Sequence, residues 1–463
     1  MPEISPGDTA WVMISAALVL FMTPGLALFY GGMVRAKSVL NMMMMSFLAM
    51  GLVTVIWVLF GFSLAFGDDV GGGLIGGADF IGLEGTLDRV VGAEGNGIPL
   101  LAFAMFQLTF AIITAALLSG AVADRVRIRA WIVFISVWSI LVYLPIAHWA
   151  FFFDDGAGGW IGDRLGALDF AGGTAVEINS GFSSLALAFV VGRRVGWRRD
   201  PMRPHNLPLV LLGAGILWFG WFGFNAGSAL AANGLASTAM INTQISTACA
   251  ALTWVIVERF RDGKATTLGV ASGAVAGAVA ITPACGFVTP LGALAIGLAA
   301  GAICSLAIGL KYRFGYDDSL DVLGVHGVGG LVGMIAIGLF ATVAANSGGA
   351  DGLFYGGGFG LLGKQLLASV ATMAFAFGVT WLIAKVIDRT IGFRIAPDDE
   401  VSGVDLAEHA ESAYDIVGSG GAAGGVFAGV GHGFGHGIGQ GPSQRHGHDP
   451  ADPSTEPQDP ASH

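Results

Sequence analysis

The sequence predicts an all-α polytopic membrane protein with eleven transmembrane helices. Of its 463 residues, 54% are hydrophobic and only 12% are charged, about half the charged share of an average soluble domain. The chain also contains a series of apolar stretches near the length of about 20 residues that a spanning helix needs. This composition argues against a soluble enzyme and a disordered chain, and the net charge of −11 argues against nucleic-acid binding.

The predicted spanning stretches follow one another along most of the chain. They lie near residues 10–32, 39–66, 98–121, 130–149, 173–192, 207–230, 239–258, 265–282, 289–310, 322–344 and 362–387. The first has no basic segment before it and no convincing cleavage site after it, so we predict a mature helix rather than a signal peptide. The 74 glycines are roughly twice the usual share and indicate close helix packing.

Basic residues are concentrated in alternate loops. Seventeen of the 22 Lys and Arg residues lie in one set of loops and after the last stretch: Arg35, Lys37, Arg125, Arg127, Arg129, Arg193, Arg194, Arg198, Arg199, Arg203, Arg259, Arg261, Lys264, Lys311, Arg313, Arg389 and Arg394. Because cytoplasmic loops accumulate Lys and Arg, the N-terminus is predicted outside and the C-terminus inside. The predicted location is the inner (cytoplasmic) membrane of the cell.

The composition changes after the last stretch. We predict a transmembrane domain over residues 1–392, a charged cytoplasmic region over 393–415 and a disordered Gly/His/Pro-rich tail over 416–463. Histidines in the tail could bind a metal, but such tracts are more often solvated sequence without that role. We predict no metal site and no cofactor.

Two ionisable residues lie within predicted spans, where they usually face a cavity or a partner. Glu177 lies in the fifth stretch and His326 in the tenth. These stretches hold the same place in two five-helix halves, which fits an inverted pseudo-repeat with a substrate path at its interface, followed by a long final helix. The alternative is that Glu177 and His326 are separate buried groups, each satisfied internally.

Aromatic residues recur at helical spacing in two stretches. Phe106 and Phe110 share one helix face, and Trp221, Phe224 and Ser228 share another. Such faces more often contact lipid or the protein core. A hydroxyl beside aromatic rings, however, suits a small cation, because oxygen replaces its water and each ring face attracts it. Ammonium fits such a lining.

Several ordered motifs give the sequence a resemblance to a known family. These are TPGLALFYGGMVR, MFQLTFAIIT, LPIAH, LDFAGGTAVEIN, WFGFNAGS and DVLGVHGVGG. Along nearly all of residues 10–415 the chain resembles the ammonium transporter family (Amt/Mep/Rh), in particular its bacterial Amt-like members. The resemblance implies eleven helices with the N-terminus outside, and a homotrimer in which each subunit carries a narrow, mostly apolar pore.

The resemblance also implies roles for the aromatic residues. Phe110 and Phe224 would be the stacked rings that close the outer mouth. Phe106 and Ser228 would help to form a cation site above these rings. Trp221 would line the pore below them.

Four further positions follow from the resemblance, and two of them depart from the family pattern. His326 matches the second histidine of the family's pore pair, while Glu177 replaces the first, as in some fungal members. Phe151, three residues after His148, stands where the family has an outer recruitment tryptophan, and phenylalanine is the weaker cation–π face. Asp169 matches an outer aspartate, and we expect it to cap the following helix rather than to bind the cation directly.

The expected chemistry depends on the carboxylate–imidazole pair. In a dry pore the proton belongs to the pair rather than to one residue. Our hypothesis is that ammonium loses its proton near the outer gate, ammonia crosses the apolar stretch and the pair relays a proton inward. In the rival hypothesis, ionised Glu177 lets a cation pass whole and relaxes selectivity against potassium.

The segment at 393–415 resembles the family's cytoplasmic C-terminal region, which couples the subunits and meets PII-type signal proteins. The leading interpretation is therefore an ammonium transporter in the lipid bilayer. An ammonium sensor with little flux and an electroneutral ammonia gas channel are the alternatives. No nucleophile–base set, phosphate loop or metal motif indicates an enzyme.

Overall fold

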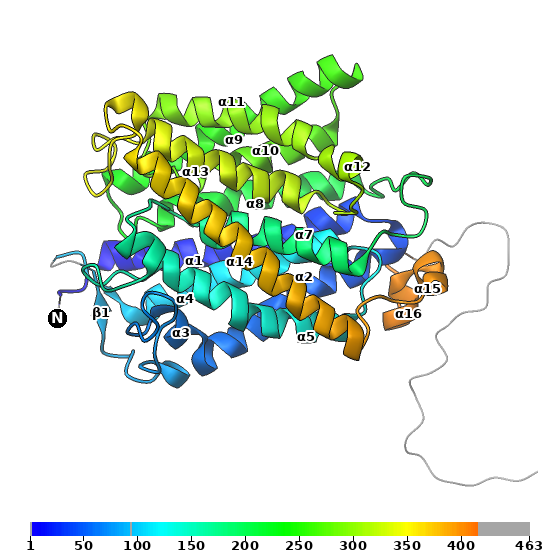
Figure 1. Ribbon diagram of the computed structural model, residues 1–463, viewed down its shortest axis with the longest axis horizontal. Helices are drawn as coiled ribbons and strands as arrows, with labels where there is room; N and C mark the ends of the chain where they lie inside the picture. The colour runs from blue at the N-terminus through cyan, green and yellow to red at the C-terminus, as the bar shows by residue number, and fades with distance from the viewer. Residues whose placement is uncertain (1, 93–94, 415–463) are drawn as a thin grey trace, which may run out of the picture. The chain divides into compact units, whose positions relative to one another are not determined.

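A computed structural model of the chain describes residues 2–92 and 95–414. The tail predicted at 416–463 lies outside these residues. Long helices run side by side in one bundle, with the N-terminus at one end and the short helices α15 (Pro397–Ser402) and α16 (Val404–His409) at the other (Figure 1). We call these ends the N-terminal face and the C-terminal face.

In the described part of the chain, ten helical stretches are long and apolar enough to span a membrane. They are α1 (Pro6–Met33), Ala36–Phe66 with α2 (Val39–Ile56) and α3 (Phe62–Phe66), Leu100–Val122 with α4 (Leu100–Leu117), Ile128–Phe151 with α5 (Ile128–Trp138) and α6 (Leu144–Phe151), Gly173–Val191 with α7 (Asn179–Val191), α8 (Leu207–Gly227), α9 (Gly234–Asp262), Pro290–Phe314 with α11 (Pro290–Ala307) and α12 (Leu310–Phe314), Leu323–Phe340 with α13 (Val328–Phe340), and α14 (Gly360–Thr390).

The stretch predicted at 265–282 forms a shorter apolar helix, α10 (Thr267–Ile281), of 15 residues. At 1.5 Å per residue it rises roughly 22 Å, less than the hydrocarbon core of about 30 Å. Two short strands, β1 (Val90–Val91) and β2 (Ile98–Pro99), pair antiparallel just before α4.

Five helices begin at a side chain that caps their first turn. Each of these side chains accepts a hydrogen bond from a backbone N–H group in the first turn. They are Ser5 for α1, Asn206 for α8, Asn233 for α9, Thr266 for α10 and Thr289 for α11. Each such cap contributes about 1 kcal/mol to the stability of its helix. The polar residues between apolar stretches therefore fix where these helices begin.

Two spans begin with a π-helical turn instead. Turn η7 (Gly173–Ile178) leads into α7, and turn η8 (Leu323–Gly327) leads into α13. Such turns are rare, frequently lie at functional sites and shift the direction of the side chains they carry. The turns η7 and η8 carry Glu177 and His326.

Glycine allows the closest helix contacts. A Cβ atom on Gly213 of α8 would lie 2.3 Å from the backbone N of Phe29 in α1, and one on Gly181 of α7 would lie 2.2 Å from the Cα of Gly327. Any larger residue would force these backbones apart. The first and sixth predicted stretches therefore pack directly against each other, as do the fifth and tenth.

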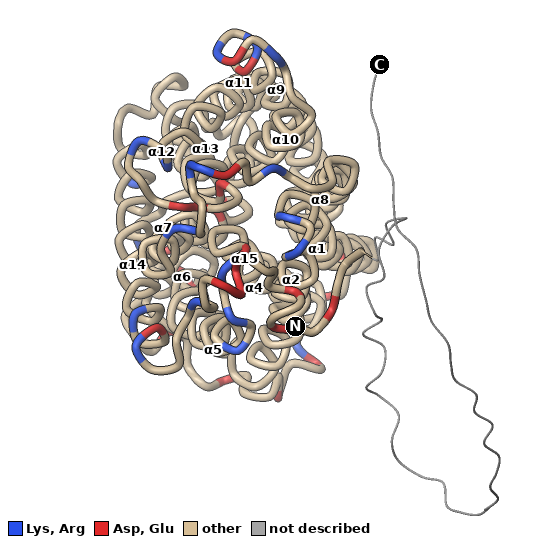
Figure 2. Tube along the Cα trace, turned by 90° about the vertical axis from the view of Figure 1, so that its right-hand side faces the viewer, with Lys and Arg blue, Asp and Glu red and all other residues tan. Residues whose placement is uncertain are grey.

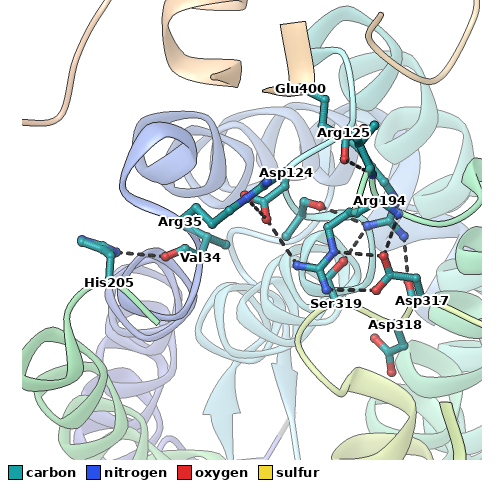
Figure 3. A network of polar contacts seen from close by, with 12 residues as sticks. Val34, Arg35, Asp124, Arg125, Arg194, His205, Asp317, Asp318, Ser319 and Glu400 are labelled. Atoms are coloured by element: carbon teal, nitrogen blue, oxygen red, sulfur yellow. Dashed lines mark hydrogen bonds and ion pairs between the residues drawn. The ribbon is translucent and has the colours of Figure 1, made fainter. Parts of the chain in front are cut away.

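Loops that carry many of the basic residues meet at the C-terminal face. Arg194 pairs with Asp317 at 2.9 Å and with Asp124 at 3.3 Å, and Arg35 joins Asp124 at 3.1 Å (Figure 3). Although burial raises the pKa of Asp317, the nearby Arg125 and Arg194 outweigh burial and lower it. Figure 2 shows charged positions gathered in the connecting loops and few along the helices.

The C-terminal helices contact the same face through carboxylates. Asp405 accepts a hydrogen bond from the backbone N–H of Asn41 at 2.8 Å, near the start of α2. Glu408 accepts one from the N–H of Ile128 at 3.0 Å, at the start of α5. A negative charge at a helix N-terminus is stabilising. These two contacts therefore hold the C-terminal helices against the N-terminal ends of α2 and α5.

Candidate functional site

A pair of aromatic rings joins α4 and α8 within the bundle. The ring centroids of Phe110 and Phe224 lie 4.3 Å apart at an angle of 42°, and both side chains are buried. Phe106, one turn before Phe110, meets it edge-on at 4.9 Å. Ser228 follows Phe224 by one turn, and its hydroxyl donates to the Phe224 carbonyl at 2.8 Å. The two aromatic faces predicted from spacing thus face each other.

A small cavity of about 10 Å³ lies next to these rings, with room for a single water-sized molecule. Phe224, Trp221, Glu177 and His326 line it together with apolar side chains from α1, α4 and α8. The indole N–H of Trp221 donates to the Thr282 hydroxyl at 2.9 Å, which fixes the ring against the cavity. Whatever occupies this cavity must be small and able to shed nearly all its water.

Glu177 and His326 form one buried pair, which we call the pore pair. The Glu177 Oε2 atom lies 2.7 Å from the His326 Nδ1 atom, and the residues are 1% and 4% exposed. A Cβ atom on Gly330 would lie 2.8 Å from the Glu177 Cβ, so the glutamate backbone is closely confined. At this distance the two groups share a hydrogen bond.

A second cavity continues beyond the pore pair toward the C-terminal face. It measures about 60 Å³, is lined by His326, Tyr30, Glu258 and Asp321, and has room for a few water molecules. Asp321 forms an ion pair with Lys311 at 2.7 Å. Because His326 lines both cavities, it stands between a smaller, mainly apolar cavity and a larger, more polar one.

Two predicted residues lie apart from these cavities. The carboxylate of Asp169 accepts hydrogen bonds from the backbone N–H groups of Gly172, Gly173 and Thr174 and from the Thr174 hydroxyl. Its oxygens therefore hold the turn that leads into η7, as a capping role requires. Phe151 is the last residue of α6 and is half-buried, and within the described residues it makes no ring pair with the aromatics of α4 or α8.

The small volume and mainly apolar walls of the first cavity are unfavourable for an isolated ion. Moving an isolated ion into an apolar interior costs several kcal/mol or more even after relaxation. A molecule that leaves its proton outside avoids this cost. The carboxylate and the imidazole offer the proton a separate place to reside.

Comparison with known proteins identifies the family. The sequence matches the model of the Ammonium Transporter Family over residues 10–414. The chain belongs to the ammonium transporter family. The transporter is 53% identical over 437 residues to an ammonium transporter of Mycobacterium tuberculosis, a match that covers 90% of this chain and 92% of the relative. It is 49% identical to an ammonium transporter of Bacillus subtilis, with 88% and 98% covered.

Solved structures place the transporter in the same all-helical membrane fold. The crystal structure of Saccharomyces cerevisiae Mep2 matches with a TM-score of 0.76 and 34% identity, covering 85% of this chain and 91% of that one. A structure described as a sensor Amt protein matches with a TM-score of 0.79 and 28% identity, covering 87% and 98%. The chain is thus a multi-pass membrane transporter rather than an enzyme.

Sequence reasoning missed three residues that line or support the transporter's cavities. Glu258 lies at the end of the stretch predicted at 239–258, and the rule that ionisable residues in spans are functional candidates would have selected it. Tyr30 and Thr282 carry no charge and follow no distinctive spacing. Only the packing of α1 and α10 against the pore pair reveals their position.

Proposed function

We propose that the transporter takes up ammonium by recruiting the cation, removing its proton near the Phe110–Phe224 rings and conducting ammonia past the pore pair. Glu177 and His326 relay the proton inward beside the ammonia. The net result is electrogenic uptake of ammonium. The observation that supports this proposal most directly is that His326 lines both cavities and is hydrogen-bonded to the buried Glu177 carboxylate at 2.7 Å.

The size and lining of the first cavity support the conduction of ammonia rather than hydrated ammonium. A cavity of about 10 Å³ leaves no space for a hydration shell. Its walls are apolar apart from Glu177, His326 and the Trp221 indole. An intact ammonium ion would therefore depend on Glu177 alone for charge compensation, which is the rival mechanism.

The test is to replace the carboxylate and to record currents from proteoliposomes after jumps of ammonium and of potassium. Glu177→Gln keeps the size of the side chain but cannot take up a proton, and we expect the ammonium current to fall by about tenfold or more. Glu177→His restores a titratable group and is expected to retain current. Glu84→Gln makes the same chemical change at an exposed site and serves as the control.

The same recordings decide between the mechanisms. A potassium current in the unmodified protein that disappears in Glu177→His would support passage of the whole cation. If Glu177→Gln leaves both the rate and the selectivity unchanged, neither mechanism holds.

A second candidate function is ammonium sensing with little flux, favoured by the likeness to the structure described as a sensor Amt protein. Currents at two lipid-to-protein ratios test it. A current that decays faster at higher protein density requires transport, whereas decay independent of density indicates binding alone. Ammonia flux without any current would instead identify an electroneutral gas channel.

We further propose that the C-terminal face is cytoplasmic in the inner membrane and that three subunits assemble. The arginine-rich loops on this face support the orientation. Exposed apolar side chains on α1 and α8, and others on α9 and α11, offer two surfaces for subunit contacts. The segment held against α2 and α5 is the proposed docking region of a PII-type protein. Cross-linking in membranes and pull-down with purified PII protein test these proposals.

A further inference from the structure

A large open cavity lies on the C-terminal face just beyond Asp321. Its volume is about 480 Å³, within the range of about 300–1,000 Å³ typical of small-molecule sites. Asp321 lines both this cavity and the 60 Å³ cavity that reaches His326. The large cavity is therefore the mouth through which the proposed path leaves the protein.

The wall of this mouth carries two arginines, Arg198 and Arg199, that form no ion pair in the described part of the chain, and one carboxylate, Asp200, beside them. Loop 193–203, which we call the arginine loop, contributes Arg194, Arg198 and Arg199 to the cavity. Arg194 is paired with Asp317, and Lys311 across the cavity is paired with Asp321. Within the described residues Arg198 and Arg199 form no ion pair, and neither does the neighbouring exposed Arg193.

Aromatic contacts hold part of this charge in place. Trp197 and Tyr312 both line the cavity, and their rings stack with centroids 6.0 Å apart and an interplanar angle of 14°. The guanidinium carbons of Arg193 and Arg198 lie 4.9 Å and 5.6 Å from the Trp197 ring centre. Such cation–π contacts already restrict the motion of the guanidinium groups, so these groups lose less conformational entropy when they bind a ligand.

The backbone of the arginine loop adds to this order. Arg198 has a φ of 65°, a left-handed conformation that is uncommon for a residue other than glycine. Such a conformation persists only where the surroundings fix it, and it recurs at ligand sites.

The fixed positive charge is unfavourable for a mouth that releases a cation. The unpaired guanidinium groups repel the proton that the pore pair passes toward this mouth, and the repulsion grows where protein replaces water. An anion in the cavity would remove this repulsion but would also cover the opening. The cavity therefore favours a bound anion, and such an anion would limit the flux through the opening.

We propose that the cavity bounded by the arginine loop and Tyr312 binds a phosphate-bearing anion, with Arg198 and Arg199 as its principal contacts. The planar guanidinium fork matches the geometry of phosphate oxygens better than a lysine does. Occupancy places the ligand over Asp321 and slows release from the pore. This inference goes beyond the proposed transport function, because binding is measurable whether or not the protein conducts.

The test measures the binding of pyrophosphate and of ATP by calorimetry to the full-length protein in phosphatidylcholine nanodiscs. We expect saturable binding that weakens as potassium chloride is raised from low to high concentration. The double variant Arg198→Gln/Arg199→Gln is expected to weaken binding by about tenfold or more. The control is Arg129→Gln/Arg259→Gln, which makes the same change in charge at exposed arginines that do not line the cavity.

Nanodiscs that contain phosphatidylglycerol separate the two sources of phosphate. Binding in both kinds of disc assigns the site to a soluble anion. If soluble anions no longer bind in the phosphatidylglycerol discs, and the double variant binds them in neither kind of disc, the site is assigned to a lipid headgroup. Either result supports a phosphate site. Absence of saturable binding in phosphatidylcholine discs, or equal loss of binding in the control variant, overturns the proposal.

Discussion

At the scale of single residues, the carboxylates of this protein divide into those that hold structure and those that we propose to take part in transport. Asp169 belongs to the first group because both its oxygens accept hydrogen bonds from the turn before α7. Glu177 belongs to the second, since its partner within the described residues is a titratable imidazole.

Replacing Asp169 tests this division. Asp169→Asn keeps one oxygen acceptor and loses the charge, so the turn at Gly172–Thr174 loses part of its charge-assisted bonding, worth about 1.5–3 kcal/mol for each bond. We expect a melting temperature in detergent several degrees lower than that of the unmodified protein. A recruitment role predicts the reverse pattern, with an unchanged melting temperature and weaker apparent affinity for ammonium.

Asp318 should make stability depend on pH. Its burial, and then the neighbouring Asp321, raise its pKa to about 6 from the usual 3.8. Because the folded protein holds this proton more tightly than the unfolded chain, its contribution to stability is complete below about pH 4 and is lost as pH rises through 6. Asp318→Asn, which can still accept from the N–H of Leu323, should flatten the pH profile of the melting temperature between these values. An identical slope in the variant would contradict the assignment.

At the scale of helices, glycine contacts set the spacing around the pore pair. Gly181→Ala would place a methyl group 2.2 Å from the Cα atom of Gly327, and no side-chain movement can relieve a clash with backbone. We expect little folded protein, measured as the monodisperse fraction in size-exclusion chromatography. Gly378→Ala is the control, since nothing lies within 4 Å of that added atom, and it should stabilise α14 by about 0.5–1 kcal/mol.

The sequence predicted the helices better than their internal irregularities. Hydropathy located the stretches that form the spans because burial in lipid demands apolar length. It could not predict η7 and η8, because a π-helical turn changes hydrogen bonding without changing composition. The pairing of Glu177 with His326 was foreseen from family resemblance, whereas the Thr282 partner of Trp221 depends on packing between helices distant in sequence.

At the scale of the whole molecule, the network on the C-terminal face ties four loops together. Arg194 links Asp124 and Asp317, both fully buried at their side chains. Arg194→Gln would leave these carboxylates without their shared partner, and breaking a buried pair in this way costs about 3–5 kcal/mol. We expect a clearly lower melting temperature for Arg194→Gln. Arg199→Gln, in the same loop but exposed and unpaired, should stay within about 0.5 kcal/mol of the unmodified protein.

The arrangement of this network could not be read from the sequence. The charge pattern predicted that the basic loops lie together, but ion pairing between loops depends on how the helix ends are placed. Pairing of Arg194 with a carboxylate from residues 315–322, more than a hundred positions away, follows only from the packed bundle.

The direct contact between Gly181 and Gly327 means that main chain, rather than side chains, sets the separation of the two pore walls. Shortening a lining residue should therefore widen the proposed path only by the volume of the atoms removed, while the spacing of the two helices stays the same. We expect a path for larger amines to require a wider spacing of the two helices in addition to shorter side chains. We therefore expect the backbone to set an upper limit on the size of the transported molecule. This limit should persist when the residues that line the path change.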